Sequence, residues 1–217
     1  VFDRGMVSDA NLTDIEKATL KYISALDKDQ IPGIAEKTIK KFKDLDVNNP
    51  GPKLHELGFT KFDNLLYYRD LGLIKQRRYV IGLNPELLSQ ERSLRLKLLD
   101  EVDSALKELN NSLKAALKSR KKEPTAKKVE KILHQKNARQ FIKWELKPIT
   151  VERTVTTKKR GEYKRQISTF QLNWSRCSER IAEKQLLDGV CLFVSNHIEK
   201  TKEANRTYAV RAETMVC

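Results

Sequence analysis

The run Val190-Cys191-Leu192-Phe193-Val194 is short and wholly apolar, which is typical of a β-strand covered on both faces. A helix that runs to Leu187 is expected just before it, with Ser175 or Ser178 as its N-cap. A second, largely apolar run at 21–26 (KYISAL) predicts another buried strand near the start of the chain. Strands that alternate with helices predict an α/β fold.

The first residues are expected to form a strand, a turn and a helix. Residues 1–2 are apolar, 3–5 (DRG) break the run, and Ser8 suits a helix N-cap. With the strand at 21–26 they predict a β-α-β unit, which usually forms a parallel pair with a right-handed crossover. Functional groups gather at the carboxyl ends of such strands, where Asp3 lies. An aspartate there is also a common turn former or helix cap, so both interpretations stay open.

Residues 28–78 give weaker patterns, because prolines and glycines divide them into short segments. Within them, 34–42 predicts one short helix. The run 79–83 (YVIGL) predicts a strand that Asn84-Pro85 closes.

A long helix is predicted from about residue 87, because apolar residues then recur in alternating steps of three and four. A basic stretch at 118–122 ends it, and a second helix is predicted over about 125–139. The two helices most simply form an antiparallel hairpin with a basic tip, whose seam is protein core. The seam residues are Leu99, Val102, Leu106, Leu109, Leu113 and Ala116, facing Val129, Ile132 and Leu133.

The spacing of the apolar residues then changes from a helical period to a period of two. This predicts a β-hairpin over about 141–174 with a basic turn at 158–162. Pro148 indicates an edge strand or a bulge. Trp144 and Trp174 could stack on nucleic-acid bases, but packing in the hairpin core is the favoured interpretation.

The positive charge is concentrated in one segment of the chain. The net formal charge is +14, and residues 91–166 hold 22 Lys and Arg against 10 Asp and Glu. Such a segment on a nearly neutral body indicates a polyanionic partner, although a solvated lysine-rich helix surface is the alternative. The candidate phosphate contacts lie at the two predicted tips: Arg120, Lys121, Lys122, Lys127, Lys128, Lys158, Lys159, Arg160, Lys164 and Arg165.

Several classes of protein lack support in the sequence. No apolar stretch approaches the roughly 18 residues of a membrane span, and no signal peptide precedes the first strand. Three cysteines without C-x-x-C spacing disfavour disulfide scaffolds and zinc ribbons. The three scattered histidines, and the absence of G-x-S-x-G, Walker A and G-x-G-x-x-G motifs, leave no zinc, serine-hydrolase or nucleotide site of those kinds.

Two motifs resemble the DDE transposases of bacterial insertion sequences, in the group named after insertion sequence four. The first is 3–8 (DRGMVS), followed by a helix and a strand, and the second is 187–196 (LDGVCLFVSN). The resemblance implies an α/β fold with a partial ribonuclease H-like core at 1–27 and 186–217. A large basic α+β insertion at 28–185 would interrupt this core with the helical hairpin and the β-hairpin.

The resemblance also implies a chemistry. In that family three carboxylates hold two divalent ions, usually Mg²⁺ or Mn²⁺, about 3.5–4 Å apart for in-line attack on DNA phosphodiesters. Asp3 would be one metal ligand and catalytic residue. The partner implied is double-stranded DNA at transposon ends, in the bacterial cytoplasm near the nucleoid, with a homodimer possible for the intact protein.

The other two carboxylates are expected outside this chain. The family's first aspartate would precede Val1. The Y-x2-R-x3-E signature fits Tyr208 and Arg211 but meets Met215 at the glutamate, so the better alignment takes 212–216 as the start of the helix just before the signature. The expectation is therefore a central fragment of a longer protein that does not cleave DNA alone. The competing hypothesis is a non-catalytic nucleic-acid-binding module in which Asp3 is a helix cap.

Overall fold

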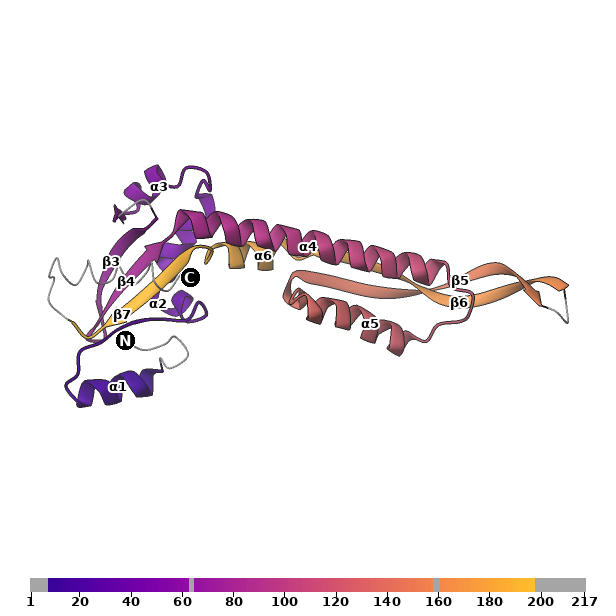
Figure 1. Ribbon diagram of the computed structural model, residues 1–217, viewed down its shortest axis with the longest axis horizontal. Helices are drawn as coiled ribbons and strands as arrows, with labels where there is room; N and C mark the ends of the chain where they lie inside the picture. Colours follow the sequence, from indigo (N-terminus) through magenta and orange to yellow (C-terminus); the bar gives the residue numbers. More distant parts are fainter. Residues whose placement is uncertain (1–7, 63–64, 158–160, 198–217) are drawn as a thin grey trace. The chain divides into compact units, whose positions relative to one another are not determined.

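The computed structural model describes residues 8–62, 65–157 and 161–197, and over these residues the chain is a mixed α/β protein (Figure 1). The chain divides into two compact units, 1–93 with 182–217 and 94–181. The sequence analysis placed the boundaries of the insertion at 28 and 185. In the structure, residues 28–93 belong to the unit that contains the terminal segments, because the strand at 77–83 pairs with the strand at 190–195.

A five-stranded sheet forms the centre of the first unit, and every neighbouring pair in it is antiparallel. The strands predicted at 21–26, 79–83 and 190–194 are all present, while the parallel partner predicted at 1–2 lies outside the described residues. The order across the sheet is β1 (Ile23–Ala25), β7 (Val190–Ser195), β4 (Arg77–Leu83), β3 (Tyr67–Ile74) and β2 (Thr60–Lys61).

Short helices contribute to the core on one face of this sheet. They are α1 (Asp9–Lys17), α2 (Ile31–Ile39) with the 3₁₀ helix η2 (Lys40–Asp44), and α3 (Gly51–Glu56). Ser8 caps α1 as predicted, since its Oγ accepts a hydrogen bond from the Asn11 amide at 3.2 Å. Fully buried side chains from the helices, including Ile31 and Leu54, pack with Ile81 and Leu192 of the sheet.

The end of β7 is fastened to the start of β1 by side chains. Asn196 accepts from the Tyr22 amide at 3.0 Å and donates to the Leu20 carbonyl at 2.7 Å. Ser195 donates to the Tyr22 carbonyl at 2.7 Å. The serine and asparagine of the 187–196 motif therefore extend the pairing of β1 and β7 beyond the last backbone pair.

The aspartate and glycine of the same motif lie against the first turns of α4 (Pro85–Lys114). Gly189 has φ 65°, and a Cβ there would lie 2.8 Å from the Leu88 Cβ, so only glycine fits. The Asn84 amide donates to the Gly189 carbonyl at 2.8 Å. Asp188 is only 2% exposed, with the Arg92 guanidinium 3.6 Å away. This motif thus joins β7 to the start of α4.

The second unit contains a long helix and a long β-hairpin side by side (Figure 1). Its elements are α4 from residue 94, α5 (Lys122–Gln135), η3 (Arg139–Phe141), β5 (Ile142–Thr157), β6 (Gly161–Arg176) and the start of α6 (Ser178–Gln185). The predicted helices and hairpin are confirmed, although α5 ends before 139 because Asn137 takes a left-handed conformation with φ 51°. Pro148 pairs with Phe170 without a register shift, so the edge-strand interpretation holds and the bulge is absent.

The predicted heptad seam is the core of this unit. Leu99, Val102 and Leu106 are at most 1% exposed and pack with buried residues of the other elements. Those partners include Val129 of α5 and Leu172 of β6. In the described part of the chain, no helix is long and apolar enough to cross a membrane.

Candidate nucleic-acid interface

The basic loop between α4 and α5, residues 115–121, is held against strand β6. The Arg120 amide donates to the Ser168 carbonyl at 2.9 Å, and the Ser168 amide donates to the Ser119 hydroxyl at 3.4 Å. The structure therefore brings the basic tip of the helical hairpin beside the β-hairpin, where the sequence analysis treated two separate tips.

A pair of arginines lies on the β-hairpin close to the same loop. Arg153 of β5 stands directly opposite Arg165 of β6, and its guanidinium donates to the Lys114 carbonyl at the end of α4. Like charges directly opposite on neighbouring strands destabilise a hairpin. An arrangement of this kind favours an anion close to both guanidinium groups.

Arg153 was not among the candidates predicted from the sequence. The register that pairs Thr157 with Gly161 places residue 153 opposite residue 165, whereas the predicted turn at 158–162 does not give this pair.

Most described candidates have no carboxylate partner. Lys127 pairs with Glu123 at 2.8 Å and Lys164 with Glu152 at 3.6 Å, both on the exposed surface. Lys158, Lys159 and Arg160 lie outside the described residues. Within the part of the chain that the structure describes, no carboxylate pairs with the remaining candidates, which are all exposed: Arg120, Lys121, Lys122, Lys128 and Arg165.

The two units differ strongly in net charge. Residues 94–181 carry 23 Lys and Arg against 10 Asp and Glu, a net charge of +13. The other unit carries 20 against 19. Too few carboxylates are present in the basic unit to neutralise its cations, so this unit carries nearly the whole positive field of the chain.

The tryptophans of the hairpin have structural partners. Trp144 and Trp174 stand opposite each other and pack, partly buried, against the core of the second unit. The Trp174 indole nitrogen donates to Asp103 of α4 at 2.9 Å, and Arg176 binds the same carboxylate at 2.6 Å. These contacts confirm the core interpretation for both tryptophans.

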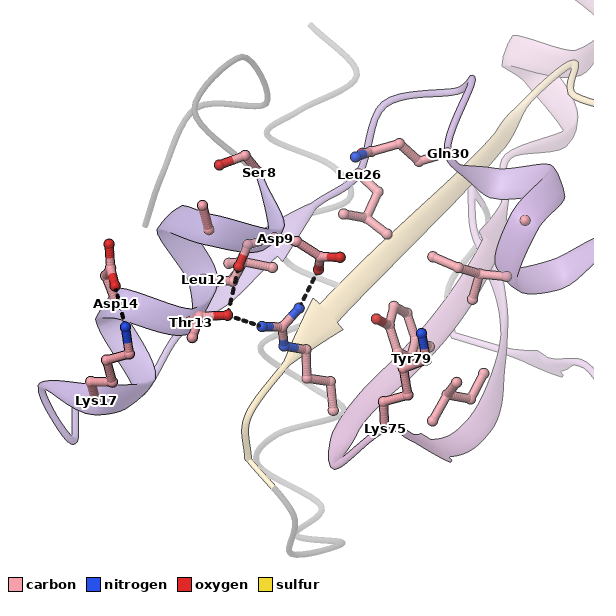
Figure 2. A pocket seen from close by; sticks show the side chains of 15 residues that line it. Ser8, Asp9, Leu12, Thr13, Asp14, Lys17, Leu26, Gln30, Lys75 and Tyr79 are labelled. Atoms are coloured by element: carbon pink, nitrogen blue, oxygen red, sulfur yellow. Dashed lines mark hydrogen bonds and ion pairs between the residues drawn. The ribbon is translucent and has the colours of Figure 1, made fainter.

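A second group of charged residues lies in the first unit, around a cavity of about 680 Å³ between α1 and the sheet (Figure 2). Arg77 of β4 binds Asp9 at 2.5 Å, Thr13 at 3.2 Å and Glu16 at 2.7 Å. Tyr22 donates to Glu16 at 2.7 Å. Because one guanidinium binds two carboxylates here, this group fastens α1 to β4 and leaves no unpaired positive charge in it for an anionic ligand.

The same contacts shift the pKa values of the side chains that make them. The hydrogen bond from Arg77 holds the pKa of Glu16 below its usual value. Burial, and then the hydrogen bond to Glu16, raises the pKa of Tyr22. Burial also raises the pKa of Tyr79, whose side chain borders the cavity (Figure 2). These groups therefore keep their ordinary charges at neutral pH.

The one ligand that the transposase resemblance assigns to this chain is not among the described residues. Asp3 lies outside them, and residues 8–62, 65–157 and 161–197 contain no group of three or more His, Cys, Asp or Glu side chains that could hold a metal ion. The buried carboxylate of Asp188 faces Arg92 instead. No step of a metal-dependent reaction is derived from these residues.

Comparisons of the chain with protein-family models, with curated proteins and with solved structures find no match. Functional inference for this chain therefore rests on its own residues.

Proposed function

We propose that this chain binds nucleic acid through its 94–181 unit and is part of a DNA transposase of the DDE class. The observation that supports this most directly is the set of exposed cations without carboxylate partners on and around the α4–α5 loop and the β-hairpin. They belong to a unit with a net charge of +13.

Phosphate groups suit this surface for two physical reasons. Unpaired Lys and Arg side chains neutralise phosphates and release condensed counterions, which supplies most of the affinity of non-specific binding. A phosphate near Arg153 and Arg165 also relieves the repulsion between the two guanidinium groups. Such contacts position a duplex without reading its sequence.

The transposase part of the proposal has a different basis. It rests on the resemblance of residues 3–8 and 187–196 to the family motifs. In this proposal Asp3 supplies one of the carboxylates for Mg²⁺, and the 94–181 unit holds transposon-end DNA. The second motif contributes packing and hydrogen bonds around β7, so the proposed chemistry depends on Asp3 alone among the residues of this chain.

Binding is tested by the fluorescence anisotropy of a labelled DNA duplex at salt concentrations from about 50 to 200 mM. With about six phosphate contacts, log K should fall against log salt with a slope near −5. The Arg165→Gln variant should lower the slope by about one, as expected for the loss of one phosphate contact. The Lys17→Gln variant is the matched control, because it removes one exposed cation from the nearly neutral unit. Absent or salt-independent binding contradicts the proposal.

The DNA that flanks the coding region separates a transposase from a non-catalytic binding module. A transposase predicts terminal inverted repeats, an upstream strand that ends in aspartate and a downstream Y-x2-R-x3-E signature. A binding module predicts none of these, and their joint absence would leave nucleic-acid binding as the whole function.

A further inference from the structure

A small cleft opens where α4 ends and α5 begins, inside the 94–181 unit. Its volume is about 180 Å³, and Leu113 forms part of its apolar lining. No carboxylate borders it. Its cationic and hydroxyl side chains come from α4, the loop and α5: Ser112, Ser119, Arg120, Lys121, Thr125 and Lys128.

The hydroxyl groups differ in what they can offer a ligand. Thr125 donates its proton to the Lys121 carbonyl at 2.8 Å, so it has none left to donate. Ser119 Oγ accepts from the Ser168 amide at 3.4 Å and keeps its own proton free. The Ser112 hydroxyl makes no hydrogen bond in the part of the chain that the structure describes. Two hydroxyl donors and three cations therefore remain available around one cleft.

We infer that this cleft is a seat for a single phosphate group, held by Arg120, Lys121 and Lys128 with the hydroxyls of Ser112 and Ser119. A wall made of cations and hydroxyl donors, without any carboxylate, favours an anion with several acceptor oxygens. The site deepens the proposed function and rests on it where the phosphate belongs to a nucleic-acid backbone. Free phosphate shares the same chemistry.

The size of the cleft suits a small group. Its volume leaves room for several water molecules. Small-molecule pockets usually measure about 300–1,000 Å³. A phosphate group with a few waters fits this space, and the cations and hydroxyls around it favour phosphate over an uncharged ligand.

Lys127 and Lys128 provide a matched pair for the test. They are adjacent on α5, both are exposed, and either substitution by glutamine removes one positive charge. Lys127 pairs with Glu123 at 2.8 Å and does not border the cleft. Lys128 borders the cleft and has no carboxylate partner among the described residues. Only Lys128 should therefore matter for the seat.

The first measurement is duplex binding by anisotropy at fixed salt, with circular dichroism to verify that each variant is folded. Lys128→Gln should bind DNA about tenfold more weakly, with a salt slope smaller by about one. Lys127→Gln should stay within about twofold of the unmodified chain. Equal losses in the two variants would overturn a backbone-phosphate seat while leaving general nucleic-acid binding intact.

The second measurement is a titration with inorganic phosphate, followed by amide chemical shifts against a chloride titration of equal ionic strength. Saturable shifts at residues 119–121 and 125 in the unmodified chain and in Lys127→Gln, but not in Lys128→Gln, support the seat. The absence of such shifts, together with equal DNA binding by both variants, overturns it.

The two measurements also distinguish the sources of phosphate and the two proposals. Phosphate that displaces DNA from the unmodified chain, but not from Lys128→Gln, assigns the seat to the nucleic-acid backbone. If inorganic phosphate saturates the seat but Lys128→Gln leaves DNA binding unchanged, the seat is assigned to free phosphate. If the chain does not bind DNA at all, the proposed function fails, and the phosphate titration still decides the seat.

Discussion

Removal of the Glu16 carboxylate should destabilise the first unit by about 2–3 kcal/mol. Glu16 accepts from Arg77 at 2.7 and 3.1 Å and from the Tyr22 hydroxyl at 2.7 Å. A hydrogen bond to a charged group contributes about 1.5–3 kcal/mol, and bonds that share one carboxylate do not add fully. The Arg77 side chain is only 12% exposed in the unmodified chain, and Glu16→Ala removes the partner with which it makes two of its hydrogen bonds. Glu16→Gln keeps an acceptor, so its cost should be about 1 kcal/mol.

The cost should also depend on pH, because Arg77 holds the pKa of Glu16 below its ordinary value of 4.5. A carboxyl group whose pKa is lower in the folded state stabilises that state above the unfolded pKa. This stabilisation is lost as the pH falls through the folded pKa. The difference in the free energy of unfolding between the unmodified chain and Glu16→Gln should therefore be largest near pH 7 and decrease below about pH 4.5.

Urea-dependent hydrogen exchange, measured on peptides from β4 and β7, follows the unit that contains Glu16. Asp14→Asn is the control on the same helix, since it breaks a largely exposed ion pair with Lys17 and should change the stability by less than about 0.5 kcal/mol. Equal effects of Glu16→Ala and Asp14→Asn, or a Glu16→Gln difference that does not change with pH, would refute the reasoning.

Two further pairs of variants test the packing. Gly189→Ala should lower the free energy of unfolding by about 3 kcal/mol, because its φ is 65° and the new Cβ would lie 2.8 Å from Leu88. Gly33→Ala in α2 should raise it by about 0.5–1 kcal/mol, since the new Cβ meets nothing within 4 Å. Both are checked by the same exchange experiment, and a tolerated Gly189→Ala contradicts the close contact. Leu106→Ala should cost about 2–5 kcal/mol because the side chain is fully buried, whereas Leu96→Ala, 52% exposed, should cost less than about 0.5 kcal/mol. Tryptophan fluorescence in urea follows the unit that contains Leu106, and similar midpoints for the two leucine variants would contradict the assigned core.

The elements with regular local patterns were predictable, and those with broken patterns were not. The seam from Leu99 to Ala116 repeats with a helical period, so α4 and its buried side could be predicted from the sequence. Strand β3 was missed because its residues are nearly all half-buried and show no alternation. A register shift between Asp70 and Gly72, where Gly72 has φ 83°, interrupts its period further.

The sequence by itself determined that the positive charge is concentrated in one segment and that this segment forms two helices and a β-hairpin. Only the tertiary structure decided which of these cations gather around one cleft. Lys127 and Lys128 are adjacent in sequence, but an α-helix turns by about 100° per residue, so one meets Glu123 and the other meets the cleft. The cleft combines the end of α4 with the start of α5, and Ser168 of β6 holds its loop in place. The α4–α5 loop and β6 are far apart in the chain and meet only through tertiary packing, which a local sequence pattern does not predict.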